Sequence, residues 1–201
     1  MGVTNRRGAT LILANGIRLR GYSFGAEKSI SGEAVFQTGM VGYPESLTDP
    51  SYAGQLLIPT FPLIGNYGVP DTKVADKFGI PLFVESDKIH CSALIVAEYT
   101  GDEQYSHWNA KMSLGQWLKE EGVPGIAGID TRALTKIIRD SGTMLAKIVL
   151  DDDTVTESDL AFYDPNVQNL VAQVSCKTTR VFNEGGAPHI VAVDVGLKYN
   201  Q

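Results

Sequence analysis

The segment from Thr38 to Gln55, TGMVGYPESLTDPSYAGQ, is the part of the chain richest in polar and glycine residues. Within it, Asp49, Pro50 and Ser51 favour a tight turn, because proline presets φ and the Asp and Ser side chains bond to nearby backbone groups. A serine hydroxyl in such a turn both donates and accepts hydrogen bonds, so it could contact a substrate. The residues alone favour an ordinary structural turn and leave a binding turn as the alternative.

Covalent catalysis would require an activated nucleophile. We expect no sharp strand-to-helix elbow of the GxSxG or GxCxG type to expose one in this chain. His90 and Cys91 are adjacent, but neighbouring residues on a strand point to opposite faces, so His90 could not readily act as a base for Cys91. We therefore predict no catalytic residue in this chain.

Metal and nucleotide sites are also not indicated. The three histidines, His90, His107 and His189, have none of the close spacings of a preassembled metal site. Neither GxxxxGK[ST] nor GxGxxG occurs, so we predict no cofactor in this chain. The run Asp151–Asp153 lacks the ligand spacing of a calcium loop and is typical of a solvated linker.

Composition narrows the class of protein. The 201 residues carry a net charge of −6, without the basic excess that nucleic acids or anionic membranes attract. The apolar runs are far shorter than the roughly 20 residues that cross a bilayer. Two distant cysteines, Cys91 and Cys176, fit a reducing compartment, so we predict a cytoplasmic protein without nucleic-acid or membrane partners.

Alternating strands and helices must position the polar segment. Asn15-Gly16 between two alternating runs predicts a β-hairpin. Helices are predicted from Ser113, with Gln116 in a capping box, and from Asp130 or Thr131. Further strands are predicted over 32–38, 55–60, 92–99, 125–129 and 144–150, with an exposed functional loop between 60 and 92.

From residue 151 the sequence becomes acidic and poor in apolar residues, which indicates a boundary. We expect a short helix over 166–173, a linker over 176–188 and a strand from His189 to Asp194. A buried parallel strand needs neighbours on both sides, and the remaining residues could not supply them. The expectation is that a second domain begins near residue 188 and that the chain stops inside it.

Four collinear blocks carry a family resemblance. GEAVFQTGMVGYPESLTDPSY (32–52), PLIGNYGVPD (62–71), GIDTRALTKIIRDSGTMLAK (128–147) and NLVAQVS (169–175) resemble the N-terminal domain of the carbamoyl phosphate synthetase small chain. The final VAVDVGLKYNQ resembles the start of that family's class I glutamine amidotransferase domain. Within the family, the sequence of residues 25–52 is most similar to that of the fused, multifunctional pyrimidine-pathway proteins of eukaryotes. Arginine-specific small chains remain an alternative.

The resemblance implies a fold and a domain division. The fold would be α/β, a three-layer β/β/α swivelling-type domain followed by the first strand of a truncated amidotransferase domain. Residues 8–150 would form the small-chain N-terminal domain, 151–188 a connecting segment and linker, and 189–201 the truncated start of the amidotransferase domain.

It also implies a function. The family hydrolyses glutamine and delivers ammonia to a synthetase subunit or fused domain, where ammonia, bicarbonate and two ATP yield carbamoyl phosphate. ATP and magnesium would bind that synthetase partner, and the Cys-His-Glu glutaminase residues would lie in the amidotransferase domain. By position, Ser51 resembles the family's glutamine-contacting serine. The chain would dock on the synthetase, help form the glutamine pocket and be inactive alone.

Two other functions remain open. The chain could be a stand-alone interaction or assembly module without a substrate, because the glutaminase residues are not in it. Swivelling domains also carry phosphate on histidine, which would involve His90 or His107, although no motif supports that role.

Overall fold

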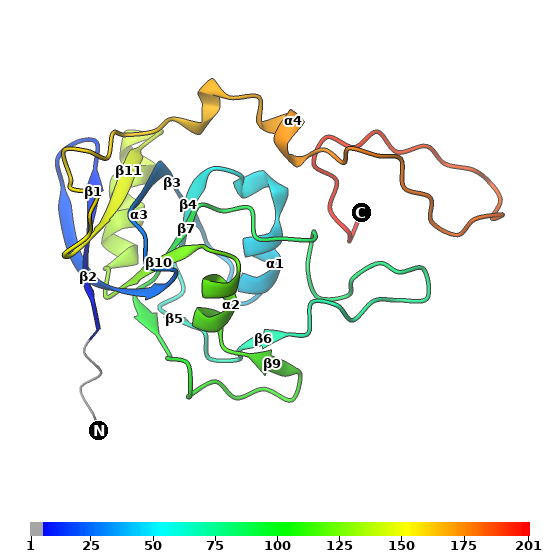
Figure 1. Ribbon diagram of the computed structural model, residues 1–201, viewed down its shortest axis with the longest axis horizontal. Helices are drawn as coiled ribbons and strands as arrows, with labels where there is room; N and C mark the ends of the chain where they lie inside the picture. Colours follow the sequence, from blue (N-terminus) through cyan, green and yellow to red (C-terminus); the bar gives the residue numbers. More distant parts are fainter. Residues whose placement is uncertain (1–5) are drawn as a thin grey trace.

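A computed structural model describes residues 6–201 (Figure 1), and its opening element is the expected hairpin. Strands β1 (Gly8–Leu13) and β2 (Arg18–Gly25) pair antiparallel around Asn15 and Gly16. The Asn15 side-chain oxygen accepts a hydrogen bond from Ile17 N at 3.1 Å, and Gly16 has φ of 88°, which glycine adopts without strain. The predicted hairpin is therefore confirmed.

Within residues 6–201, seven strands close into a barrel in the order β1-β11-β3-β4-β7-β10-β2. The other five are β3 (Ile30–Gln37), β4 (Gln55–Pro59), β7 (Ala93–Ile95), β10 (Pro124–Ala127) and β11 (Leu145–Leu150). Strands β3, β4, β7 and β10 run parallel, and the remaining pairs are antiparallel. The α/β class is confirmed. Hydrogen bonds join the parallel and antiparallel strands into one closed sheet. The three-layer swivelling description of the fold stays a prediction.

Two helices begin at the predicted caps. Helix α2 (Leu114–Glu120) starts at Ser113, whose hydroxyl accepts from Gln116 N at 3.0 Å, and the Gln116 side chain donates to Glu120 instead of closing the capping box. Helix α3 (Thr131–Ser141) starts at Asp130, whose carboxylate accepts from Ala133 N at 2.9 Å. These caps satisfy backbone N–H groups that the first helical turn leaves unpaired.

The barrel wall is covered on both faces. In the part of the chain described, buried apolar side chains form two clusters, one including α3 and one including α1 (Tyr43–Thr48) and α2. Leu56 and Ile58 of β4 belong to the first cluster, and Leu57 between them belongs to the second. Successive strand residues point to opposite faces, so a strand buried on both sides is continuously apolar.

The segment between β4 and β7 is partly packed. Strand β5 (Leu63–Ile64) pairs with β8 (Glu98–Tyr99). Strand β6 (Val69–Pro70) pairs with β9 (Ala110–Met112). The single strand predicted over 92–99 is wrong, because it is split into β7 and β8. Val96 N still bonds to Ile126 O of β10, whereas Glu98 pairs with β5, so the chain leaves the barrel between them.

Residues 151–164 are fastened to the barrel. Lys147 of β11 is buried, and its ammonium donates to Glu157 O at 2.7 Å and Leu160 O at 2.9 Å. Arg18 makes a bidentate ion pair with Glu157, and Arg20 pairs with Asp151. In the acidic run, Asp151 is thus held by Arg20 of the β-hairpin, and Asp153 accepts hydrogen bonds from Ser29, so the run is not a free linker.

Beyond residue 164 the prediction is only partly correct. The helix expected over 166–173 is a turn of 3-10 helix, η2 (Pro165–Val167), followed by α4 (Leu170–Val174). The strand expected over 189–194 is wrong: those residues form no strand, and Ile190 and Val191 are 87% and 90% exposed. A strand requires backbone partners, and no neighbouring strand lies beside this segment within residues 6–201. Figure 1 shows residues 176–201 extending away from the barrel and returning toward α1.

Candidate functional site

Ser51 lies on a single turn of 3-10 helix, η1 (Pro50–Tyr52), directly after α1. One carboxylate oxygen of Asp49 accepts from Ser51 N at 2.9 Å, and Asp49 O accepts from Tyr52 N at 3.1 Å. The predicted turn is confirmed, and Asp49 caps it. The Ser51 side chain is exposed, and its hydroxyl makes no hydrogen bond to any residue in the range 6–201.

A pair of stacked tyrosines positions α1, the helix that precedes this turn. Tyr67 and Tyr43 stack with ring centroids 4.2 Å apart, and the Tyr67 hydroxyl oxygen accepts from Gly42 N and Tyr43 N at 2.8 and 3.1 Å. The Tyr43 hydroxyl in turn donates to Gly68 O at 2.6 Å. Burial raises the pKa of both phenols, so both stay neutral donors and acceptors and hold α1 in place.

The C-terminal segment, residues 194–201, lies beside the Ser51 turn. Lys198 Nζ is 3.3 Å from the second carboxylate oxygen of Asp49. A methyl group added at Gly196 would lie 3.5 Å from Pro50 Cβ and 3.0 Å from a methyl carbon of Val174. Asp49 therefore connects the Ser51 turn to Lys198, 149 positions later in the chain.

Glu85 holds the same segment from another side. Its carbonyl oxygen accepts from Tyr199 N at 2.9 Å, and its carboxylate accepts from the Asn200 side-chain amide at 2.8 Å. Through Tyr199 and Asn200, the loop before β7 and the C-terminal segment become neighbours of the Ser51 turn.

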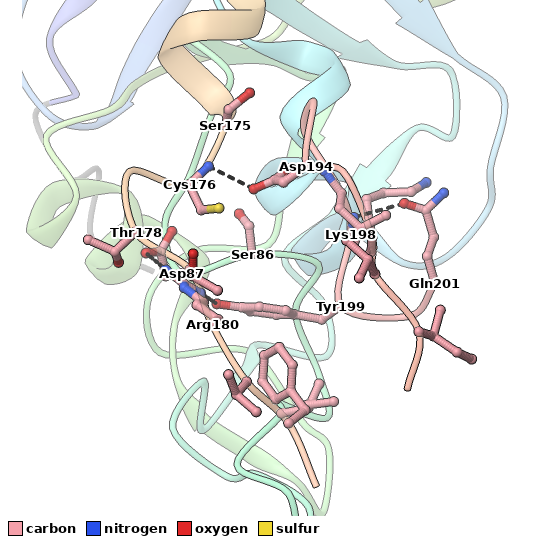
Figure 2. A pocket seen from close by; sticks show the side chains of 18 of the residues that line it. Ser86, Asp87, Ser175, Cys176, Thr178, Arg180, Asp194, Lys198, Tyr199 and Gln201 are labelled. Atoms are coloured by element: carbon pink, nitrogen blue, oxygen red, sulfur yellow. Dashed lines mark hydrogen bonds and ion pairs between the residues drawn. The ribbon is translucent and has the colours of Figure 1, made fainter. Parts of the chain in front are cut away.

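A cavity of about 1240 Å³ opens next to this contact and is shown in Figure 2. Residues of the loop 86–90 and of the segment 173–201 line it, together with Pro50 and Ile80, but Ser51 is not among the lining residues. The Arg180 guanidinium lies 3.8 Å from an Asp87 carboxylate oxygen and donates to the Tyr199 hydroxyl at 3.3 Å. The lining of the cavity therefore includes charged side chains of both signs.

Asp194 orders the turn that leads to Lys198. Its carboxylate accepts from the backbone N–H groups of Leu197, Cys176 and Gly196 at 2.7 to 2.8 Å. These hydrogen bonds, that from Leu197 foremost, lower the pKa of Asp194 below its usual range despite an opposing desolvation effect. The carboxylate is therefore charged at neutral pH.

The other sequence candidates make no hydrogen bond to Ser51 within residues 6–201. Cys91 is buried, and burial raises the pKa of its thiol to about 12, which leaves a neutral thiol and a poor nucleophile. His90 lines the cavity, is half-buried, and has its pKa lowered by burial. His107 lies edge-on to Tyr67 on a different loop. The structure brings none of these three to Ser51.

One motif was missed in the sequence. Gly21–Gly25, GYSFG, matches GxSxG, contrary to the expectation that no such pattern would occur. The structure places it inside β2, where Ser23 Oγ is buried without a partner among the described residues. A nucleophile elbow needs an exposed hydroxyl between a strand and a helix. Ser23 lies in the middle of a hairpin strand, so the correction adds no catalytic residue.

Two further findings concern metal binding and membrane-spanning helices. Across residues 6–201, no three His, Cys, Asp or Glu side chains are close enough together to hold a metal ion. No helix in that range has the length and apolar character needed to cross a membrane.

Sequence reasoning did not find Lys198, Glu85 or Asp194. Each acts through a contact with a residue more than 15 positions away, and nothing in the local sequence indicates such a partner. The only signal was that Lys198 and Asp194 both fall in VAVDVGLKYNQ, one of the family-like stretches.

Comparison with known proteins identifies the family. The model of the carbamoyl-phosphate synthase small chain, CPSase domain, matches residues 11–148, and the chain belongs to this family. The match begins within β1 and ends within β11, so it includes residues of all seven barrel strands.

Individual relatives are similar over nearly the whole chain. Multifunctional protein URA2 of Saccharomyces cerevisiae is 47% identical over 229 residues and covers 100% of this chain. The mitochondrial carbamoyl-phosphate synthase [ammonia] of Mus musculus is 52% identical over 192 residues, and multifunctional protein CAD of Squalus acanthias is 51% identical over 193, each covering 96%. The chain spans only 10%, 12% and 8% of these relatives' lengths, respectively.

A solved structure, a peptidase M28 precursor from Shewanella amazonensis, is 8% identical with a TM-score of 0.34, covering 72% of this chain and 34% of its own. That likeness is too weak to support an argument.

Proposed function

We propose that this chain is the domain of a carbamoyl phosphate synthetase that docks on the synthetase part and supplies Ser51 to the glutamine pocket, for carbamoyl phosphate formation from glutamine, bicarbonate and ATP. The observation that carries the proposal is the Ser51 hydroxyl, which is exposed on a capped turn and faces no competing partner among the described residues. Family membership supplies the reaction to which such a hydroxyl would contribute.

The turn is suited to binding a small amino acid. The Asp49 carboxylate fixes the backbone N–H of Ser51, so the turn is ordered before a ligand arrives. The free hydroxyl can then donate to a carboxylate or accept from an ammonium group, and glutamine carries both. An ordered turn reduces the entropy lost on binding, which favours affinity.

The chemical step belongs elsewhere in this proposal. A Cys-His-Glu set in an amidotransferase domain would hydrolyse glutamine, and the synthetase part would hold ATP and magnesium. The neutral, buried thiol of Cys91 is consistent with this division, because it could not act as the glutaminase nucleophile. The isolated chain would then be inactive, and its cytoplasmic location and a role in pyrimidine or arginine synthesis remain part of the proposal.

An exposed apolar surface next to Tyr67 supports docking. Loops 38–42 and 105–108 both contact Tyr67, through Gly42 N and the His107 ring. They expose Met40, Val41 and Trp108, whose exposed fractions are 70%, 76% and 86%. Exposed tryptophan and methionine are enriched where proteins bind one another, so this Tyr67 surface is where the synthetase part would dock.

Replacing Ser51 with phenylalanine tests the glutamine role in the synthetase that carries this chain. The bulky ring would fill the space of the substrate, so we expect glutamine-dependent synthesis to fall at least tenfold, the effect of losing roughly 1.4 kcal/mol of transition-state binding. Ammonia-dependent synthesis should be unchanged, because it bypasses the pocket. Both rates are measured by steady-state kinetics.

The matched control is Ser141→Phe at the exposed end of α3. It should leave both rates unchanged. If Ser51→Phe also left glutamine-dependent synthesis at the wild-type rate, the pocket assignment would be wrong. Loss of both rates in Ser51→Phe would instead indicate a general structural defect.

A further inference from the structure

Two acidic side chains hold residues 198–200. Asp49 pairs with Lys198 Nζ at 3.3 Å, and both side chains are partly buried. Glu85 binds the next two residues, through its carbonyl to Tyr199 N at 2.9 Å and its carboxylate to the Asn200 amide at 2.8 Å. The three consecutive residues are therefore fixed by both backbone and side-chain contacts.

Glu85 is itself rigidly placed. Its backbone N–H donates to the Thr48 hydroxyl at 2.9 Å, and Thr48 is buried at the last turn of α1. The neighbouring Ser86 hydroxyl donates to Thr48 O at 2.6 Å. Because only Asp49 separates Thr48 from η1, the loop that carries Glu85 and the turn that carries Ser51 are attached to the same end of α1.

The position is unfavourable for an acidic side chain. The second carboxylate oxygen of Glu85 is buried and makes no hydrogen bond within residues 6–201, and burying such an oxygen without a donor costs free energy. Glu45 is close enough for the two carboxylates to repel, and its pKa is raised by burial and, to a lesser extent, by Glu85. An apolar side chain at position 85 would not carry the cost of this unbonded oxygen.

We propose that Glu85 is a positioning residue for the glutamine pocket: it holds Tyr199 and Asn200 so that the C-terminal segment stays against the Ser51 turn. Asp49 completes the arrangement, since one oxygen orders Ser51 N and the other binds Lys198. The inference rests on the proposed role of Ser51, and it adds that the pocket depends on a contact between the loop before β7 and the end of this chain.

The first test measures hydrogen exchange in this chain with Glu85→Leu and Glu85→Gln. Leucine removes the acceptor for Asn200, so amides of residues 196–201 should exchange about fivefold faster, the effect of losing one hydrogen bond. Glutamine retains a carbonyl oxygen and should stay within about twofold of wild type. Unchanged exchange in the barrel strands shows that the fold is intact.

The second test uses the synthetase that carries this chain. Glu85→Leu should raise KM for glutamine about fivefold with kcat unchanged, because only the placement of the pocket wall is loosened. Ammonia-dependent synthesis should not change. Glu98→Leu is the matched control, since Glu98 is exposed on β8 and its side chain makes no hydrogen bond or ion pair within the part of the chain described.

The outcomes separate the two proposals. Glu85 has no positioning role if Glu85→Leu matches Glu98→Leu both in amide hydrogen exchange and in KM for glutamine. If Ser51→Phe loses glutamine-dependent synthesis in the same experiments, the pocket assignment stands. If neither Ser51→Phe nor Glu85→Leu affects glutamine use, the pocket assignment itself fails. Glu85→Gln behaving like Glu85→Leu would overturn the acceptor role of the Glu85 carboxylate.

Discussion

At the scale of single residues, the site depends on carboxylates that each hold more than one group. Asp49 binds Ser51 N with one oxygen and Lys198 with the other, and Asp194 binds three backbone N–H groups. A carboxylate can accept several hydrogen bonds at once, so one side chain can join segments distant in sequence. The order of the C-terminal segment therefore depends on a few carboxylate side chains.

The pH dependence of Asp194 follows from its lowered pKa. A carboxyl group whose folded pKa is below the unfolded value, about 4, stabilises the ordered form above that value. The contribution is lost as pH falls through the lower folded pKa. We expect the amide signals of Gly196 and Leu197 in NMR spectra to stay constant from pH 7 to about 5 and to move toward unfolded positions only in strong acid.

The Asp194→Asn variant is the control for that titration. Asparagine keeps one acceptor oxygen but cannot ionise, so the acid-dependent change should disappear. A titration of the same amides in Asp194→Asn that matched wild type would assign the effect to another group.

At the scale of elements, burial on both faces of the barrel wall makes β4 intolerant of change. Leu57 is buried against the cluster that includes α1 and α2. Leu57→Ala should lower the free energy of unfolding by about 2–5 kcal/mol, because it removes apolar contact and leaves a cavity. Urea denaturation measures the change.

Leu82→Ala is the comparison for that variant. Leu82 is exposed in the loop between β6 and β7, so the same substitution should alter stability by less than about 0.5 kcal/mol. Equal losses in the two variants would contradict the two-faced packing of β4.

Sequence patterns predicted elements whose signals are local. Asn15-Gly16 gave the hairpin, and Ser113 and Asp130 gave the starts of two helices, because turn and cap preferences act within a few residues. The strand predicted over 189–194 was wrong because an apolar run indicates only a segment that could be buried, and burial requires a partner. Similarly, the one strand predicted over 92–99 is split by a change of partner that no local pattern records.

At the scale of the whole molecule, closure of the barrel could not be predicted from local sequence. It requires β11 to insert between β1 and β3 and β10 to pair with β2, and these strands are far apart along the chain. The same limit applies to the candidate site: the Ser51 turn was predictable from Asp49 and Pro50, whereas the contacts of Glu85 with Tyr199 and Asn200 arise only from the fold.

Docking can be tested on the Tyr67 surface. If the synthetase part docks there as proposed, Trp108→Ala should weaken its binding to this chain roughly 30-fold in Kd, the usual loss of about 2 kcal/mol for an interface tryptophan. The chain should remain folded, since the Trp108 side chain is exposed. Isothermal titration calorimetry with the synthetase domain measures Kd.

Phe78→Ala provides the comparison, because Phe78 is a partly exposed aromatic residue on a separate loop. Its Kd should match wild type. Equal affinities for Trp108→Ala and wild type would show that the synthetase binds another face.

The closed barrel also affects how this domain avoids unwanted association. An open sheet ends in strands with unpaired backbone groups, which can recruit strands of other chains and start aggregation. Each of the seven barrel strands has neighbours on both sides. Any protein that binds the barrel must therefore recognise side chains and loops, and the domain gains resistance to fibril-like growth through its barrel strands.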